Sequence, residues 1–199
     1  MTLFRRTLAA AAVALAAMPL AAQEIPLNQI SAYLNGLTTA TGAFTQVTET
    51  GEVSTGTIYI KRPGRVRFEY NPPEKAMVIA AGGQLAIFDP RSDEPTRYPL
   101  NQTPLSIILA RDVDLSRANM VTGVKSDGQS TTVRAQDPDN PEYGSIDLVF
   151  TDNPIQLRQW VVNDGNGSST TVILGELETG GRVRERLFNI VAEARIWSP

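Results

Sequence analysis

Residues 56–70 read Gly-Thr-Ile-Tyr-Ile-Lys-Arg-Pro-Gly-Arg-Val-Arg-Phe-Glu-Tyr, two alternating segments around a Pro-Gly turn. In the first segment Ile58, Ile60 and Arg62 share one face, because successive side chains of a strand point to opposite sides. In the second, the apolar face carries Val66, Phe68 and Tyr70. A period of two on both sides of a turn predicts an antiparallel pair of strands.

The same pattern continues along the chain. After Phe44, further strand-like runs are separated by turn-forming Gly, Pro, Asn and Asp. These runs are residues 77–80, 85–88, 131–134, 146–150, 155–162 and 170–174. Strands at this spacing predict a mainly β protein with an antiparallel sheet, arranged as a sandwich or a barrel. No repeat or linker divides the chain, so we expect a single domain over residues 23–199.

One helix is predicted ahead of the strands. Its apolar stripe recurs at a helical spacing, and residues 38–42 are expected to end it. The stripe consists of Leu27, Ile30, Tyr33, Leu34 and Leu37. At the other end of the chain, residues 184–196 fit either a final strand or a loop that crosses the sheet.

Residues 1–22 have the pattern of a secretory signal peptide. Arg5 and Arg6 precede an apolar run, and small residues at 19–22 suit a signal peptidase. The run is shorter than the ~20 residues that span a bilayer, which favours a removed signal over the alternative of a retained anchor. Secretion without any cysteine is typical of a bacterial periplasm. We therefore expect a mature chain that is soluble in the periplasm.

Composition excludes several kinds of chemistry. The 199 residues contain no Cys and no His, so imidazole or thiolate nucleophiles and metal ligands of these types are absent. We expect no metal and no cofactor. The formal net charge of −3 argues against a nucleic-acid partner. A hydrolase with paired carboxylates stays open, but its candidates, Asp89, Glu94, Asp112 and Asp114, lie in turn-like segments, so we do not expect an enzyme.

A short apolar segment interrupts the strands at residues 103–110. Thr103 is a suitable N-cap and Pro104 suits the first helical position. The helix that follows is apolar on almost every side, unlike a surface helix. It fits two interpretations, a plug that completes the core or a lid over an apolar cavity; its residues are Leu105, Ile107, Ile108 and Leu109.

Arg62 is the most informative single residue. Its position on the strand face of Ile58 and Ile60 points its guanidinium inward if that face is buried. A buried Arg needs several acceptors, such as carbonyl groups at the end of a lid helix. The alternative is that Arg62, next to Pro63, lies at the strand end and reaches water.

The chain resembles a known family in several of these segments. Phe44-Thr-Gln46, the run from Gly56 to Tyr70 and the hairpin of residues 78–89 are similar to the periplasmic outer-membrane lipoprotein carriers, the LolA-like proteins. Residues 103–109 fall where that family has its lid helix. The resemblance implies one curved antiparallel sheet that forms an incomplete, half β-barrel, with an N-terminal helix and the lid helix across its concave face.

The resemblance also implies a function. Such a carrier takes lipoproteins from an ABC-type transporter at the inner membrane and delivers them to an outer-membrane receptor, as a monomer. Arg62 matches the arginine that holds the lid closed, whereas Val66 replaces a larger aromatic residue of well-known members. The expected lining of the acyl-chain cavity is Ile58, Ile60, Val66, Phe68, Tyr70, Ile79 and Ile87. The alternatives are a periplasmic lipid-binding sensor and a scaffold module with a solid core.

Overall fold

The computed structural model describes residues 24–197, and the predicted signal peptide lies outside this range. Within it, one antiparallel sheet is ordered β6-β5-β4-β3-β2-β1-β11-β10-β9-β8-β7, and β12 pairs with β1. The strands are β1 (Thr39–Thr48), β2 (Val53–Lys61), β3 (Val66–Tyr70), β4 (Met77–Ala81), β5 (Gln84–Phe88), β6 (Thr96–Pro99), β7 (Val121–Ser126), β8 (Ser130–Gln136), β9 (Ser145–Thr151), β10 (Gln156–Asn163), β11 (Ser169–Leu174) and β12 (Glu178–Thr179).

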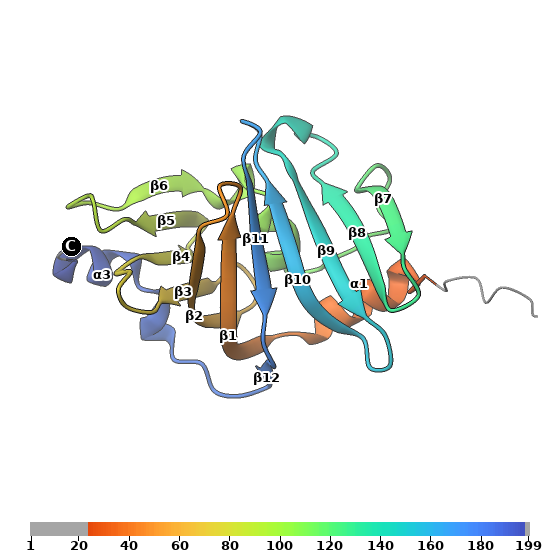
Figure 1. The fold of residues 1–199 in the computed structure, drawn as a ribbon, viewed down its shortest axis with the longest axis horizontal. Helices are drawn as coiled ribbons and strands as arrows, with labels where there is room; N and C mark the ends of the chain where they lie inside the picture. Colours follow the sequence, from red (N-terminus) through yellow and green to blue (C-terminus); the bar gives the residue numbers. More distant parts are fainter. Residues whose placement is uncertain (1–23, 198–199) are drawn as a thin grey trace, which may run out of the picture.

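Within the described residues, three α-helices and three short 3₁₀ helices accompany the sheet. They are α1 (Leu27–Gly36), η1 (Leu100–Gln102), α2 (Leu105–Leu109), η2 (Pro141–Tyr143), η3 (Glu185–Phe188) and α3 (Ile190–Ile196). The expectation of a mainly β protein with one open antiparallel sheet is confirmed, and the sheet does not close into a barrel (Figure 1). No helix within residues 24–197 has both the length and the apolar character needed to cross a membrane.

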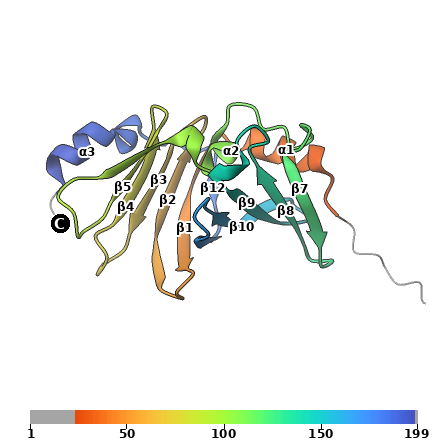
Figure 2. The ribbon, with the colours of Figure 1, turned by 90° about the horizontal axis from the view of Figure 1, so that it is seen from above.

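The sheet bends into two wings, β2–β5 and β7–β10, which are inclined to each other in Figure 2. The face that packs against α1 and α2 is called the inner face below. Its buried cluster joins α1 (Ile30, Leu34) and α2 (Ile107, Ile108, Leu109) to side chains from both wings. The opposite, outer face of β4 and β5 packs against α3 in a second cluster, which includes Met77, Phe88 and Ile190.

Gly56 shows how tightly the inner face is packed. A Cβ atom there would lie 2.1 Å from the carbonyl oxygen of Glu69 and 2.6 Å from Cε1 of Phe44. The absence of a side chain lets the ring of Phe44 sit edge-on to Phe68 and Tyr70, with centroid distances of 5.2 and 5.1 Å. The glycine therefore belongs to the aromatic core of the first wing.

Four expectations about local structure were wrong. Residues 39–42 begin β1 instead of ending the helix, and Gly42 fits there because a Cβ would lie 2.7 Å from the carbonyl oxygen of Glu176. Thr103 does not cap α2; its hydroxyl donates to the carbonyl oxygen of Leu100, and Pro104 is the N-cap residue. Residues 184–196 form η3 and α3, neither a strand nor a loop. Finally, β6 and β7 were missed, and both are edge strands.

Candidate functional site

The β2–β3 turn meets the C-terminal ends of two helices at Arg62. The Arg62 Nη1 group donates a hydrogen bond to the carbonyl oxygen of Leu34 in α1. Its Nη2 group donates to the carbonyl oxygen of Ala110, just after α2, at 2.6 Å, with a longer contact of 3.4 Å to Oδ1 of Asn35. The guanidinium thus lies between the carbonyl ends of α1 and α2, where the helix dipoles favour a cation.

The backbone of the same turn also holds α2. The amide of Gly64 donates to the carbonyl oxygen of Leu109 at 2.8 Å. The amide of Arg62 donates to the carbonyl oxygen of Thr38, just after α1, at 2.8 Å. Gly64 has a φ of 71°, a conformation that a glycine adopts without strain. The attachment of α2 to the sheet at this end therefore consists of two hydrogen bonds, one from the Arg62 side chain and one from the Gly64 backbone.

One hydrogen-bond donor of the Arg62 side chain has no partner within residues 24–197. Its Nε atom is buried without a hydrogen-bond partner among the described residues. Burial lowers the pKa of the Arg62 guanidinium, and the charge of Asp112 opposes that shift. Because a buried donor without a partner costs free energy, this closed arrangement is less stable than a fully bonded one.

Two polar residues of α1, which the sequence analysis did not single out, tie down the segment after α2. Asn35 donates from Nδ2 to the carbonyl oxygen of Val113 and accepts the Val113 amide at Oδ1, both at 2.9 Å. The buried hydroxyl of Ser31 accepts the amide of Leu115 at 3.1 Å. Ser31 and Asn35 are four residues apart and therefore lie on the same side of the helix. Two polar residues at this spacing beside the apolar stripe were the sequence signal that could have identified them.

The predicted cavity residues lie in three environments: the inner cluster, the outer face of β4 and, for Ile87, an open cavity at the N-terminal end of α2. Ile58, Ile60, Val66 and Phe68 are buried in the inner cluster that also holds Ile107, Ile108 and Leu109, and half-buried Tyr70 packs against it. These side chains fill the space beneath most of α2. Ile79 lies elsewhere: it faces α3 on the outer side with Phe88 and Ile190, because its position on β4 has the opposite parity.

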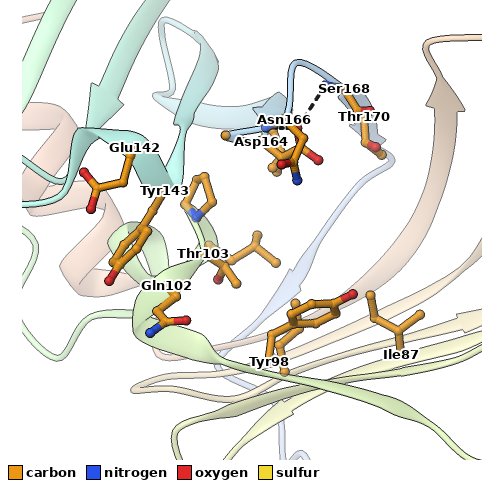
Figure 3. Close-up of a pocket in the computed structure, with 15 residues that line it drawn as sticks. Ile87, Tyr98, Gln102, Thr103, Glu142, Tyr143, Asp164, Asn166, Ser168 and Thr170 are labelled. Carbon is orange, nitrogen blue, oxygen red and sulfur yellow. Dashed lines mark hydrogen bonds between the residues drawn. The ribbon is translucent and has the colours of Figure 1, made fainter.

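An open cavity lies at the N-terminal end of α2 and is called the mouth cavity below (Figure 3). Its volume is about 470 Å³, within the range of ligand pockets. Leu85, Ile87, Tyr98 and Leu105 line one side. The other side carries Tyr143 and polar groups of η2, the β10–β11 turn and the start of β11, namely Glu142, Asp164, Asn166, Ser168 and Thr170. The arrangement offers an apolar wall that continues toward the inner cluster and a polar wall at the rim.

Comparison with known proteins gives consistent matches. Residues 35–191 match the model of the family described as outer membrane lipoprotein carrier protein LolA. An outer-membrane lipoprotein carrier protein of Methylococcus capsulatus is 23% identical, over 88% of this chain and 88% of its own. An outer-membrane lipoprotein carrier protein of Chromobacterium violaceum is 27% identical, over 85% of this chain and 84% of its own. The crystal structure of a LolA superfamily protein from Nitrosomonas europaea superposes with a TM-score of 0.46 at 10% identity, covering 83% of this chain and 98% of that one.

Proposed function

The chain belongs to the LolA family of outer membrane lipoprotein carrier proteins, and we propose that it is a non-enzymatic periplasmic carrier of lipoprotein acyl chains. In this proposal α2 is a lid, Arg62 is the residue that holds it closed, and the inner face receives the acyl chains when the lid opens. The observation that carries the proposal is the Arg62 junction, where one side chain holds the ends of α1 and α2 over an apolar interior.

The strength of the junction suits a reversible lid. A typical hydrogen bond contributes about 0.5–1.5 kcal/mol net, and bonds from a charged donor contribute roughly twice that. A few kcal/mol hold the closed state, and cargo that binds only the open state can overcome that difference. The unpaired Nε of Arg62 lowers the cost of opening further.

The mouth cavity supports a route for the cargo. Leu105 contributes to its apolar wall, and the rest of α2 covers the inner cluster. An acyl chain that enters beside Leu105 would displace α2 from the inner cluster and replace the contacts of α2 with its own. Aliphatic and aromatic walls suit such a ligand, because the hydrocarbon part of an acyl chain has no group that accepts or donates hydrogen bonds.

The free energy of moving acyl chains out of a bilayer requires both a donor and an acceptor for the carrier. Each CH₂ exposed to water costs about 0.8 kcal/mol, so withdrawing two or three long chains from a bilayer costs tens of kcal/mol. Non-covalent affinity saturates near roughly 20 kcal/mol, so a pocket cannot extract this anchor unaided. We therefore include in the proposal an ATP-driven, ABC-type donor at the inner membrane and a receptor at the outer membrane, with the carrier acting as a monomer.

Mass spectrometry of the protein isolated from periplasm tests the proposal. We expect acylated lipoprotein to co-purify with the chain. Leu105→Asn should reduce its yield, whereas Ile173→Asn, a matched change at an exposed apolar residue of β11, should not. Recovery without any acylated cargo, or equal yields from the two variants, would contradict the carrier assignment.

A further inference from the structure

The C-terminal segment carries a concentration of positive charge on the outer side of the molecule. Arg182, Arg184 and Arg186 are exposed, and the buried Val183 anchors the extended chain between the first two. Arg195 is exposed on α3. In the described part of the chain these four arginines have neither an ion pair nor a side-chain hydrogen bond, although the whole chain has a formal charge of −3.

The acidic residues of the same segment do not neutralise these arginines, because they are already paired with the sheet. Glu185 contacts Lys61 at 2.6 Å and Arg65 at 2.7 Å. Glu193 contacts the buried Arg67 at 3.0 Å. Two other acids, Asp93 and Glu94, lie near the C-terminal end of α3, away from Arg182–Arg186. They follow Ser92, whose carbonyl oxygen accepts a hydrogen bond from Trp197 just after α3. The surface over η3 and the start of α3 therefore keeps a local positive surplus.

Exposed apolar side chains flank the outward side of α3. Val191 is 57% exposed and Ile196 is 76% exposed. Because they are five residues apart, they lie about 140° apart around the helix axis, Val191 on the side of Gly82 and Gln84 and Ile196 on the side of Lys75 and Ala76. The helix cannot rotate them inward, because Ile190, Ala194 and Trp197 already pack on the outer face of β4 and β5. The Trp197 ring contacts Phe88 at 5.2 Å, and its Nε1 donates to the carbonyl oxygen of Ser92 at 2.9 Å. Figure 1 shows α3 at the end of the molecule opposite to α1.

We propose that this surface, formed by Arg182, Arg184, Arg186, Arg195, Val191 and Ile196, docks the protein on an anionic lipid bilayer. Arginines beside exposed aliphatic groups are the combination that interfacial helices use, since the cations meet lipid phosphates and the aliphatic groups enter the headgroup region. The aliphatic groups project from a short helix on the outside of the sheet, which suits a fluid surface that needs no matching shape. The remaining, net negative surface would be repelled by the same bilayer, which fixes the orientation of the bound molecule.

Vesicle binding tests the proposal without any cargo, so its outcome is independent of the carrier function. Purified protein is mixed with vesicles of equal parts phosphatidylglycerol and phosphatidylcholine, or of phosphatidylcholine alone, and separated by flotation. We expect binding to the anionic vesicles only, weakened at high ionic strength. The triple change R182Q/R184Q/R186Q should weaken it roughly 100-fold, since each basic side chain near an anionic surface contributes about fivefold.

A control with the same net charge separates a local surface from overall charge. R97Q/R111Q/K125Q removes three exposed cations from β6, the segment after α2, and β7, and should leave vesicle binding unchanged. Ile196→Ser should weaken binding at high ionic strength more than at low. Equal losses in both triple variants, or no flotation with anionic vesicles, would overturn the proposal; arginine-dependent binding to soluble polyglutamate alone would assign the surface to an acidic protein. Fatty-probe binding by the R182Q/R184Q/R186Q variant should equal that of the unchanged protein.

Discussion

The Nη2 group of Arg62 lies 2.6 Å from the carbonyl oxygen of Ala110, so one side chain at the end of β2 holds the end of α2. The other terminal nitrogen of the same guanidinium holds Leu34 at the end of α1. Rupture of this single site would leave two backbone hydrogen bonds between the β2–β3 turn and the helix ends, Gly64 to Leu109 after α2 and Arg62 to Thr38 after α1. The junction is therefore the point where a small change should have the largest effect on the lid.

Arg62→Leu should favour the open lid without unfolding the protein. The change removes the hydrogen bonds to Leu34 and Ala110, and the loss of the buried, unpartnered Nε offsets part of that effect. If the two lost bonds, less that offset, shift the lid equilibrium by about 1.4 kcal/mol, affinity for a fluorescent fatty probe should rise roughly 10-fold, and release to an acceptor should slow by a similar factor. Equilibrium titration and stopped-flow transfer measure the two effects.

Arg62→Lys is the matched control for that experiment. Lysine keeps the charge but lacks the planar fork that reaches two carbonyl groups at once. We expect an intermediate affinity. If Arg62→Leu has the same probe affinity and release rate as the unchanged protein, the Arg62 side chain does not control the lid.

Ile108→Ala should destabilise the cargo-free protein. Ile108 is 6% exposed and packs in the inner cluster, so its truncation leaves a cavity that costs about 2–4 kcal/mol of unfolding free energy. Urea denaturation followed by circular dichroism measures the change. Val53→Ala, at a 58% exposed position of β2, should cost far less. A similar, small effect at both positions would mean that α2 does not pack firmly on the sheet.

Arg67→Ala should loosen the C-terminal segment. The buried Arg67 side chain contacts Glu69 at 2.6 Å, Glu193 at 3.0 Å and the carbonyl oxygen of Leu187 at 2.9 Å. We expect a loss of about 3 kcal/mol, at the low end for a broken buried pair because both glutamates stay partly in water. Hydrogen exchange should accelerate in α3. Arg117→Ala removes an exposed pair with Asp139 and should change stability by less than about 1 kcal/mol; equal losses would refute the role given to Arg67.

Tyr70 should make stability fall at high pH. Burial raises the pKa of its phenol from 10.0 to about 12, and the charge of Glu74 adds to the rise. The protonated hydroxyl donates a hydrogen bond to Oε1 of Gln46 at 2.6 Å. Between these pH values the unfolded chain loses the proton and the folded chain keeps it, so rising pH favours unfolding. Denaturation at pH 9 to 12 should show this decline, and Tyr70→Phe should reduce it. An identical pH dependence in both proteins would show that Tyr70 ionises normally.

The period of two in residues 56–70 was sufficient to predict the β2–β3 pair, because the inner side chains within both strands are apolar and the turn residues between them suit their positions. The edge strands β6 and β7 were harder to predict. Residues Thr96–Pro99 are all exposed, so no apolar alternation marks them, and backbone pairing to β5 alone makes them a strand. The C-terminal helix was missed because residues 184–196 mix charged and apolar residues, and the contacts that order them come from distant Arg67 and Phe88.

At the site, parity correctly placed Arg62 on the inner face beside Ile60, but the partners of its guanidinium depend on where two helices end in space. Parity also distinguishes Ile79 from Val78, yet both are apolar, so the sequence does not reveal which of them faces α3. The mouth cavity is formed by segments some 80 residues apart, such as Ile87 and Thr170, and no local pattern marks it.

The most direct test of the account measures whether α2 moves when an acyl chain binds. The chain has no cysteine, so spin labels can be placed at Ser106→Cys on α2 and Ile173→Cys on β11, and their separation followed by pulsed electron paramagnetic resonance. Addition of a synthetic triacylated lipopeptide should lengthen the distance, and Arg62→Leu should show part of that lengthening without ligand. Tight binding of the lipopeptide with an unchanged distance would contradict the account.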